Sequence, residues 1–574
     1  MINNFVSRFS SGSILLATSS IWVSAATGQA IPSPSQTPPG EEVKRLSSDA
    51  ELSIRVGGSL AAPEGAETVQ ITVESAMLDV GFDPLAGQTA KLLPQPGAQI
   101  SLADLYRIAG EVQQAYLDAG YPLVRVFVPV QDLDRSNARI KLTVVSGYVG
   151  KVDVEALDPR VKKIVARYFN RLIKREPLTA AQLERAVLLA GDVSGVTLAS
   201  ALSPGTQTGE TVLIASGTFS PVQGVLSVDN RLSRELGREQ VTASFAFNSV
   251  LGLGERIGAT YATAIDDVSF SRTELRRYAG LYLDLPVGND GLVVGVDAAA
   301  STSRPRGFAS FLALSNRFVR AGGRVAYPLI RSRTSRLVAT TSFDLNRETQ
   351  ESLLLGFPVP LYRDQTRVVR FGFNASTQPE TGLFAITSVE YSKGLNILDA
   401  RSARDATIFE PLSRIGADAE FDKLTGDFLV EGAAPEIPLV GRINLRAQTG
   451  FDKPLLRSEQ LSVVSPDLIS GPPTGSLVGD SGYGVRYQIE STLPAGNLYI
   501  VPYGFAAAAR AVLERPTAFE LRRTDIKAYG AGIRTSIALV AGTIISGQLE
   551  YSHTVSDDRN LGGNWVTFGI SLRF

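Results

Sequence analysis

The chain closes with WVTFGISLRF (residues 565–574), in which apolar and polar side chains alternate strictly. One parity carries Val566, Phe568, Ile570, Leu572 and Phe574, and the other carries Thr567, Gly569, Ser571 and Arg573. A period of two residues predicts a β-strand with one apolar and one polar face. In a soluble sheet, such a strand ending on a bare aromatic residue would leave an apolar edge open to aggregation. We therefore expect this edge to be paired inside a closed structure.

The same alternation fills the chain from about residue 219 onward, where no helical pattern is evident. Apolar residues share one parity in QVTASFAF (240–247), RLVATTSFDL (336–345), RVVRFGF (367–373) and RINLRAQTG (442–450). The opposite parity holds mostly Thr, Ser, Asn, Arg, Gln and Gly. Soluble barrels point apolar side chains inward, whereas outer-membrane barrels point them at lipid and enclose a polar lumen. Residues 219–574 are therefore predicted to form an outer-membrane antiparallel β-barrel.

The connections between these strands alternate in length. VLGLGER (250–256), LPVGNDG (285–291) and TLPAGN (492–497) are tight turns, while the connections between them are longer and charged. Bacterial outer-membrane barrels have short periplasmic turns and long outer loops, and counting on this basis gives about sixteen strands of roughly 10 residues. The last strand then pairs with the first, so no free edge remains and Phe574 lies at the periplasmic interface.

The N-terminal segment has the features of a secretory signal peptide. In MINNFVSRFSSGSILLATSSIWVSAATGQA (1–30), Arg8 precedes an apolar run over 14–26 that ends in small residues. A buried N-terminal helix is the alternative. No later apolar run approaches 18 residues, so any membrane crossing must use strands. Residues 31–67 have the composition of a linker; they leave open a short helix over 41–52 and whether it plugs the lumen.

Composition excludes several classes of function. The 574 residues include no cysteine, which excludes disulfides, thiolate zinc sites and cysteine nucleophiles. His553 is the only histidine, so a multi-histidine metal site is excluded and a Ser-His-Asp triad would depend on it alone. A net charge of −1 gives no basic field that would attract nucleic acid. We expect neither catalysis nor a cofactor, and His553 is interpreted as a strand residue.

Residues 68–148 and 149–218 repeat one order of elements and are predicted to form two small α+β modules. Each begins with a strand, continues with helical segments and ends with two further strands. The predicted strands and main helices lie at 69–74, 101–120, 121–130 and 139–147 in the first module, and at 150–157, 159–174, 178–192, 195–202 and 209–217 in the second. Open sheet edges in such modules accept extended chains by β-augmentation, which favours an adaptor role; a spacer is the alternative.

Helix boundaries within the modules carry their own signals. Ser101 with Asp104, and Thr179 with Gln182, have the spacing of capping boxes. Gly120 stands where the helix of the first module is expected to end.

Several stretches fit the pattern of a known family. Residues 116–152 resemble its Tyr-x-x-x-Gly-Tyr, Pro-x-Gln and Gly-x-(Ile/Val)-Gly pattern, and LSPGTQTGETVL (202–213) resembles its Pro-Gly-x-x-x-Gly turn. The pattern positions are Tyr116, Gly120, Tyr121, Pro129, Gln131, Gly147 and Gly150. Barrel stretches at 228–257, 281–294, 327–333, 411–421 and 450–463 look like successive family segments. The order and spacing resemble the two-partner secretion transporter of the haemolysin-activator type, within the superfamily of POTRA-bearing outer-membrane barrels.

The resemblance implies a long sixth outer loop that folds back into the lumen. The matching stretch, residues 456–490, contains Gly479, Asp480, Ser481 and Gly482, which fit the family's Gly-Asp-x-Gly. The family's Val-Arg-Gly-(Tyr/Phe) tetrad, about ten residues earlier, falls on Ile469, Ser470, Gly471 and Pro472. The glycine is kept, but serine replaces the arginine and proline replaces the aromatic residue.

The family arginine reaches an aspartate in a Phe-x-Asp-x-Gly strand of the barrel wall. The matching strand here is YGFAAAARAV (503–512), with Phe505 as anchor, Ala507 at the aspartate position and Ala509 at the glycine position. Both members of the ion pair are absent together. Losing one partner of a buried pair costs about 3–5 kcal/mol, whereas replacing both is often neutral. The double absence therefore supports the resemblance and puts the family's loop lock in doubt.

The resemblance implies a protein-conducting channel in the Gram-negative outer membrane, with POTRA modules in the periplasm. A large, β-helical exoprotein would bind the modules unfolded, thread the lumen past side chains such as Arg446 and Gln448, and fold outside. Phe568, Ile570, Leu572 and Phe574 resemble the C-terminal signal read by the barrel-assembly machinery, and their parity would face outer-membrane lipid. The alternatives are a pore or receptor for small solutes or a surface polymer, or an insertase for other barrels.

Overall fold

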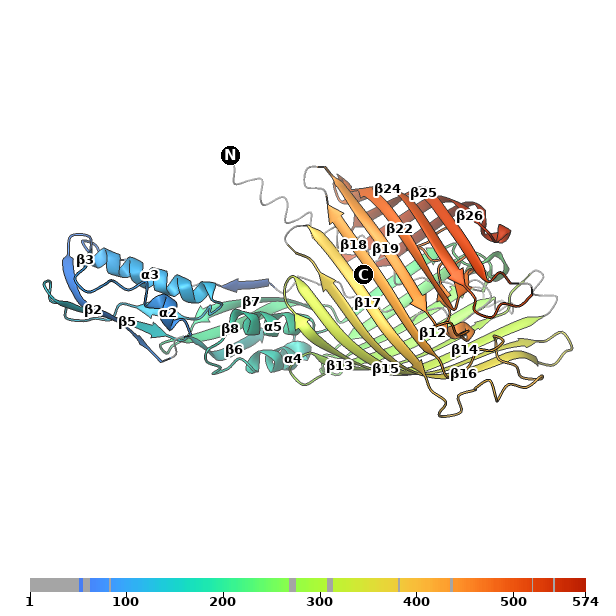
Figure 1. Ribbon diagram of the computed structural model, residues 1–574, viewed down its shortest axis with the longest axis horizontal. Coiled ribbons are helices and arrows are strands. Elements are labelled where there is room, and N and C mark those ends of the chain that lie inside the picture. Colours follow the sequence, from blue (N-terminus) through green and yellow to red (C-terminus); the bar gives the residue numbers. More distant parts are fainter. Residues whose placement is uncertain are drawn as a thin grey trace.

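Two α+β modules lead in a row into a large β-barrel (Figure 1). The computed structural model describes residues 51–54, 62–81, 84–267, 275–306, 313–379, 382–433, 437–518, 520–539 and 542–574. The predicted signal peptide and most of the predicted linker lie outside these ranges.

The first module packs one helix across a four-stranded sheet of order β3-β2-β5-β4. Its elements are β2 (Gln70–Val80), α2 (Ala86–Thr89), β3 (Gln99–Ser101), α3 (Leu102–Asp118), β4 (Arg125–Phe127) and β5 (Ala138–Val145). The capping box of Ser101 and Asp104 is confirmed at the start of α3. Helix α3 buries its apolar face, Leu105, Ile108, Ala109, Val112 and Tyr116. Gly120 follows the helix with φ of +88°, the conformation that a C-terminal glycine permits.

The second module has the sheet order β1-β7-β8-β6 with two helices packed on it. Its elements are β6 (Tyr148–Ala156), α4 (Pro159–Asn170), α5 (Ala180–Gly191), β7 (Val196–Pro204) and β8 (Glu210–Phe219). The capping box of Thr179 and Gln182 is confirmed. The prediction that α4 runs to Lys174 was too long, because Lys174 leaves the helical conformation and donates its N–H to the carbonyl of Val149. Among the helices described, none has the length and apolarity needed to span a membrane.

A short strand precedes both modules in the sequence but joins the second. β1 (Glu51–Ile54) pairs in parallel with β7, from Glu51 opposite Ala199 to Ile54 opposite Leu202. The short helix left open over 41–52 therefore does not include residues 51 and 52, which lie in β1; the rest of that range lies outside the described residues. β1 therefore covers the β7 edge of the second module's sheet.

The barrel is a closed antiparallel sheet in which each strand pairs with its neighbours in sequence. Its strands are β9 (Val222–Asp229), β10 (Gln240–Asn248), β11 (Arg256–Ala264), β12 (Arg276–Val287), β13 (Leu292–Ser303), β14 (Leu314–Arg331), β15 (Ser335–Ser352), β16 (Val359–Thr377), β17 (Leu383–Gly394), β18 (Asp422–Ala433), β19 (Leu439–Thr449), β22 (Ser481–Ser491), β23 (Leu493–Ala495), β24 (Leu498–Val512), β25 (Arg523–Ala538), β26 (Ile544–Ser556) and β27 (Gly563–Arg573). Because β23 continues β22 along β24, the closed wall has sixteen strands in the described ranges, and the predicted fold class is confirmed.

Strand lengths vary around the wall more than the sequence indicated. β9 has 8 residues, whereas β14 and β15 have 18 and β16 has 19. The expectation of roughly 10 residues per strand therefore fails at β14–β16, and again at β24 and β25, which have 15 and 16 residues. At β14–β16 the strand pairing continues through polar stretches such as residues 346–352, which follow the alternating apolar residues of β15.

The two faces of the wall differ as predicted. Phe371 and Phe373 on β16 are 50% and 53% exposed on the outside. On the inside, Asp344 and Glu348 of β15 are almost fully buried among other polar groups. The apolar face is therefore outward and the lumen is polar, which is the arrangement of a membrane barrel.

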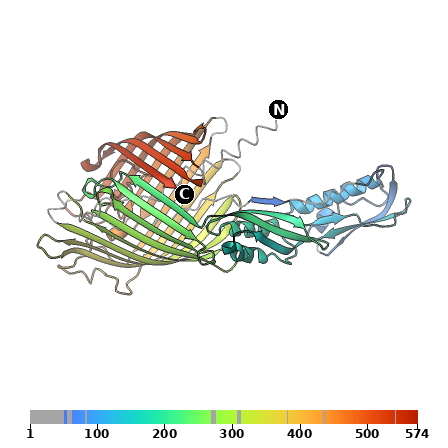
Figure 2. The same cartoon turned by 180° about the vertical axis from the view of Figure 1, so that it is seen from behind.

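Closure joins the two ends of the barrel sequence. β27 pairs with β9, from Gly569 opposite Asp229 to Arg573 opposite Val225. Figure 2 shows the red strands that end the chain beside the green strands that begin the barrel. The prediction that the last strand pairs with the first is confirmed.

Candidate functional site in the barrel lumen

Residues 450–480 form the sixth connection at the rim far from the modules, and they turn back into the lumen. We call residues 450–480 the lumen loop. It contains two short strands, β20 (Leu461–Ser462) and β21 (Val478–Gly479), which pair with each other, and the 3-10 turn η5 (Arg457–Glu459). Val463, Val464 and Ile469 are fully buried against the wall. The loop therefore packs as a core element of the barrel interior.

Asp480 of the Gly-Asp-x-Gly stretch holds the two ends of the loop together. Its buried carboxylate accepts hydrogen bonds from the backbone N–H of Leu455 (3.0 Å), from Gln460 Nε2 (2.9 Å) and from the backbone N–H of Glu514 (2.8 Å). Asp480 also lies 3.6 Å from the guanidinium of Arg414. These contacts join the start and the end of the loop to the connection that follows β24.

The glycines beside Asp480 allow close backbone approach. A Cβ on Gly479 would lie 2.8 Å from the backbone nitrogen of Val512, and one on Gly482 would lie 2.3 Å from the carbonyl oxygen of Arg510. Because both neighbours are backbone atoms of the wall, no side chain fits at either position. The glycines thus let the loop merge with β24 without a gap.

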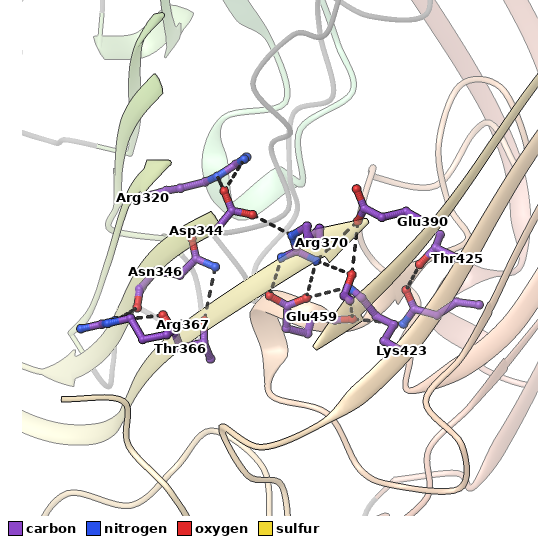
Figure 3. Close-up of polar contacts among 12 residues, drawn as sticks. Arg320, Asp344, Asn346, Thr366, Arg367, Arg370, Glu390, Lys423, Thr425 and Glu459 are labelled. Carbon is purple, nitrogen blue, oxygen red and sulfur yellow. Dashed lines mark hydrogen bonds and ion pairs between the residues drawn. The ribbon is translucent and has the colours of Figure 1, made fainter. Parts of the chain in front are cut away.

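A second carboxylate of the loop contacts the wall strands β16 and β18 (Figure 3). Glu459, 1% exposed, accepts from Arg370 Nη2 of β16 at 2.8 Å and from Lys423 Nζ of β18 at 2.6 Å. Arg370 in turn donates to Asp344 of β15 at 2.7 Å and lies 3.6 Å from Glu390 of β17. One loop residue is therefore tied to a charge network that spans four strands. Sequence reasoning missed Glu459, whose only signal was a carboxylate in the apolar setting LLRSEQL (455–461).

The tetrad positions lie at the tip of the loop, against the wall strands near the closure. The Oγ of Ser470 accepts from Arg486 Nη1 at 2.7 Å, and the Ser470 carbonyl accepts from Ser552 Oγ at 3.1 Å. Gly471 has φ of +118°, and a Cβ there would lie 2.3 Å from Ser552 Oγ. Glycine is therefore required at 471. The neighbouring Ile469 and Pro472 are also buried.

Arg486 reaches the loop from the wall. It is a buried residue of β22, and its Nη2 donates to Glu550 Oε2 of β26 at 2.8 Å. Its guanidinium lies 3.6 Å from the centre of the Phe505 ring, a cation–π contact. Gln488 accepts a further hydrogen bond at 3.0 Å. An arginine thus stands beside the wall anchor Phe505 although the loop itself carries none at the tetrad.

Ala507 and Ala509 occupy the wall positions where the resemblance implied aspartate and glycine. Both face the lumen and belong to one apolar cluster with the loop residues Val463 and Ile469. Packing therefore takes the place of the ion pair. Exchanging a buried pair for well-packed apolar groups is often neutral or favourable by about 1–4 kcal/mol, which accounts physically for the joint absence.

A third acidic residue of the loop pairs with the wall. Asp467 lies 3.2 Å from Arg446 of β19, which also pairs with Asp427 of β18. Gln448, on the same strand, donates to the carbonyls of Glu459 and Asp480, both at 3.1 Å. Arg446 and Gln448 do line the lumen, and in this conformation both hold the loop.

The pattern residues of the first module shape its backbone. Tyr116 is buried in the core, and Tyr121 packs against that core just after the helix ends. A Cβ on Gly147 would lie 2.2 Å from the carbonyl oxygen of Leu123, and one on Gly150 would lie 2.3 Å from the Glu210 carboxylate. The two glycines therefore allow close packing inside each module on either side of the junction at 148/149.

Pro129 and Gln131 together finish one edge of the first module's sheet. The β4–β5 register ends with Phe127 opposite Thr143, and two residues further it would place Pro129 opposite Lys141. Proline has no N–H to donate, so β4 cannot pair there. The Gln131 carboxamide accepts from the Lys141 N–H at 2.9 Å and donates to the Lys141 carbonyl at 3.1 Å. A side chain therefore supplies the hydrogen bonds of the missing strand, and the strand predicted over 121–130 is only three residues long.

The terminal strand presents its apolar parity outward. Ile570 and Phe574 are 56% and 43% exposed, while Phe568 and Leu572 are half-buried. Phe574 exchanges two backbone hydrogen bonds with Gly224, at 2.9 and 3.0 Å. Its ring lies over Gly224 and meets Phe245 edge-on at a centroid distance of 6.3 Å. The last residue is therefore part of the barrel closure.

The second module is clamped to the barrel by ion pairs at the rim. Asp290, in the turn between β12 and β13, pairs with Arg171 at 2.5 Å and with Arg185 at 3.2 Å, and accepts from the Tyr327 hydroxyl. Partial burial raises the pKa of Asp290, but the hydrogen bonds from Tyr327 and the two arginines outweigh it and lower the pKa to about 2. Asp192 of the module pairs with Arg331 of β14 at 2.9 Å.

No group of three or more His, Cys, Asp or Glu side chains in the described ranges is placed to hold a metal ion. His553 stacks against Tyr529 at 5.2 Å, and its Nδ1 shares a hydrogen bond with Asn564 at 2.8 Å. These neighbours lie on adjacent wall strands, which fits the interpretation of His553 as a strand residue.

Comparison with solved structures shows the fold. CdiB from Escherichia coli matches with a TM-score of 0.67 and 18% identity, over 90% of this chain and 92% of that one. CdiB from Acinetobacter baumannii matches with a TM-score of 0.58 and 15% identity, over 91% and 92%.

Sequence comparison agrees. The heme/hemopexin transporter protein HuxB of Haemophilus influenzae (strain 86-028NP) is 25% identical over 257 residues, which is 44% of each chain, so the alignment spans less than half of that relative. Residues 84–147 match the ShlB-type POTRA domain, and residues 209–534 match the haemolysin secretion/activation protein family ShlB/FhaC/HecB. Because the second match spans more than half of the chain, this protein belongs to the ShlB/FhaC/HecB family of haemolysin secretion/activation proteins, outer-membrane barrels that keep their POTRA domains in the periplasm.

Proposed function

We propose that this protein exports an unfolded exoprotein through its barrel, using the two periplasmic modules as the receptor. The observation that carries the proposal is the family match over the barrel together with a POTRA domain directly before it. In this proposal residues 1–30 are a signal peptide, 31–67 a linker, 68–148 and 149–218 two POTRA modules, and 219–574 the channel.

Receptor binding would use a free sheet edge. Because β7 is already paired with β1, the candidate edges are β3 and β4 in the first module and β6 in the second. An extended segment of the exoprotein would add a strand there through main-chain hydrogen bonds, with alternate side chains giving specificity.

Passage of the exoprotein would require part of the lumen loop to move away from its position in the lumen. Val463, Ile469 and their neighbours pack against the wall, so the conformation described is a closed one. The polar groups on the lumen face suit a hydrated extended chain, whose backbone needs hydrogen-bonding partners. Folding of the exoprotein outside prevents its return and gives the transfer its direction.

The C-terminal strand has a separate part in the proposal. Phe568, Ile570, Leu572 and Phe574 would face lipid after insertion and would be read by the barrel-assembly machinery before it. The outward exposure of Ile570 and Phe574 supports this assignment.

The experiment compares culture supernatants from cells with the full-length protein and cells with a variant lacking residues 69–218. Barrel levels in the outer membrane are matched first. One large protein should disappear from the medium of the variant and accumulate or be degraded in the periplasm. Identical supernatants would contradict export, and a steady conductance of the variant barrel in lipid bilayers would then favour a solute pore.

A further inference from the structure

The lumen loop contacts the wall at several points. These contacts differ in whether the buried polar groups of the wall would keep another partner if the loop left. Residues 465–474 form a closed turn, which we call the tip. Hydrogen bonds from the Gly475 N–H to the Val464 carbonyl and from the Ser465 N–H to the Ile469 carbonyl close it at 3.1 Å each. The rest of the loop, residues 450–464 and 475–480, is called the base.

When the contacts of the tip break, the charged groups of the wall keep other hydrogen-bonding or ion-pairing partners. Arg486 binds Ser470, but it also keeps Glu550, Gln488 and the Phe505 ring. Only neutral groups depart from it, the Ser470 hydroxyl at 2.7 Å and the Pro466 carbonyl at 3.5 Å. The contact therefore differs from an ion pair, whose rupture would strand a buried charge at a cost of about 3–5 kcal/mol.

The remaining polar contacts of the tip behave in the same way. Arg446 retains Asp427 when Asp467 leaves. The Thr474 N–H and the Ser470 carbonyl give up one hydrogen bond each, to the Arg231 carbonyl and to Ser552 Oγ. No buried wall charge named here loses all of its partners when the tip lifts.

Breaking the contacts of the base would instead leave buried groups without partners. Glu459 is the carboxylate that pairs with Lys423 in the described part of the chain, so its departure would strand a buried ammonium group. Asp480 would give up the hydrogen bond from the Glu514 N–H and the contact with the Arg414 guanidinium. Gln448 of β19 donates hydrogen bonds to both segments of the base, at the carbonyls of Glu459 and Asp480. Unpaired buried charges and donors make this release costly.

We infer that the lumen loop has two mechanically separate parts, a base that stays on the wall and a tip that leaves it, and that Arg486 is the positioning residue that sets how often the tip leaves. The inference deepens the proposed export function and rests on it for its purpose: a chain in transit displaces the tip alone. The loop need not be extracted from the barrel.

Single thiols test the inference directly, because the chain contains no cysteine. Thr474→Cys places a thiol in the buried tip, and Val463→Cys places one in the buried base. The purified full-length protein is labelled with a water-soluble maleimide, and the rate at each position reports how often that part of the loop is exposed.

Ser470→Ala is then combined with each thiol. Labelling at position 474 should rise about tenfold, the effect of losing a hydrogen bond to a charged group, while the rate at 463 changes by less than about twofold. Ser470→Thr keeps the hydroxyl and should restore the slow rate. The matched control is Ser227→Ala, a buried wall serine whose hydroxyl has no hydrogen-bond partner in the described ranges, and it should change neither rate.

Glu459→Gln addresses the base and should raise the rate at 463. Equal increases at 474 and 463 with Ser470→Ala would overturn the two-part loop, and no increase at 474 would overturn the role of Arg486. Labelling requires no exoprotein, so the outcome is independent of secretion. If the labelling pattern holds while deletion of residues 69–218 leaves the supernatant unchanged, the loop inference stands and the export proposal falls.

Discussion

Arg486 lies directly opposite Ala507 on the adjacent wall strand, and its guanidinium rests on the Phe505 ring two residues away. The positive charge beside the anchor is therefore supplied by β22, and the matching carboxylate, Glu550, by β26. Acidic residues of the loop, Glu459 and Asp467, meet basic residues of the wall. The charges that hold this loop thus run opposite to the arrangement that the family pattern implied.

The buried pair of Arg486 and Glu550 should show strong coupling. Glu550→Gln leaves the arginine poorly compensated and is expected to destabilise the barrel by about 3–5 kcal/mol, and Arg486→Met is expected to do the same. Combining the two should cost clearly less than their sum, because no charge is then left unpaired. Urea unfolding of the purified barrel measures all four proteins, and additive losses would contradict the coupling.

The position of the Phe574 ring should depend on Gly224, the residue that faces it where the last strand meets the first. A side chain at Gly224 would lie 2.4 Å from the Phe574 ring, so Gly224→Val should displace the ring and lower the amount of folded barrel in the outer membrane. Phe574→Ala should also lower it. If the ring is the obstacle, adding Gly224→Val to Phe574→Ala should cause little further loss. Outer-membrane fractions run unheated on gels report the folded fraction.

Removal of the Gln131 side chain should open a sheet edge locally. Gln131→Ala deletes both hydrogen bonds to the Lys141 backbone and should cost about 1 kcal/mol, because the group is exposed to water. Hydrogen exchange at the Lys141 amide should accelerate several-fold in the full-length protein. Gln114→Ala, which removes an exposed contact to Asp118 on α3, is the matched control and should leave that amide unchanged.

Acid should loosen the clamp between the second module and the barrel. The pKa of Asp290 is lowered to about 2 in the folded protein from an ordinary value of 3.8, so its contribution is complete above about pH 4 and is lost as the pH falls through 2. Spin labels on the module and on the barrel wall should show a broader distance distribution between pH 4 and pH 2. Asp290→Asn should broaden it already at pH 7 and reduce the change with pH. An unaltered distribution in that variant would count against the clamp.

Much of the fold follows from short-range signals. The alternation in β10, β15, β16 and β19 identifies the lipid-facing parity because neighbouring residues on a strand face opposite ways. Capping boxes at Ser101 and Thr179 were recognisable because three-residue spacing alone brings their partners together. The closure of β27 on β9 was predictable from one strand, since an apolar edge needs a partner.

The contacts that hold the lumen loop could not be predicted from such short-range signals. Glu459 meets Arg370 across 89 residues, and Ser552 meets Ser470 across 82. Before the register is known, Arg486 is one of many arginines on lumen-facing parities and has no local feature that singles it out. The same holds for β1, whose four residues become a strand only because β7 offers an edge. Tertiary contacts decide these features.

The clamp also has a mechanical consequence. The second module touches the barrel at three successive turns, near Gly254, Asp290 and Arg333, which belong to the strands from β10 to β15. The attachment is therefore off the barrel axis, and the elongated pair of modules acts as a lever arm on that sector of the wall (Figure 1). If a chain in transit binds the first module, as proposed, tension on that chain would reach β10–β15 first, where β14 and β15 each have 18 residues.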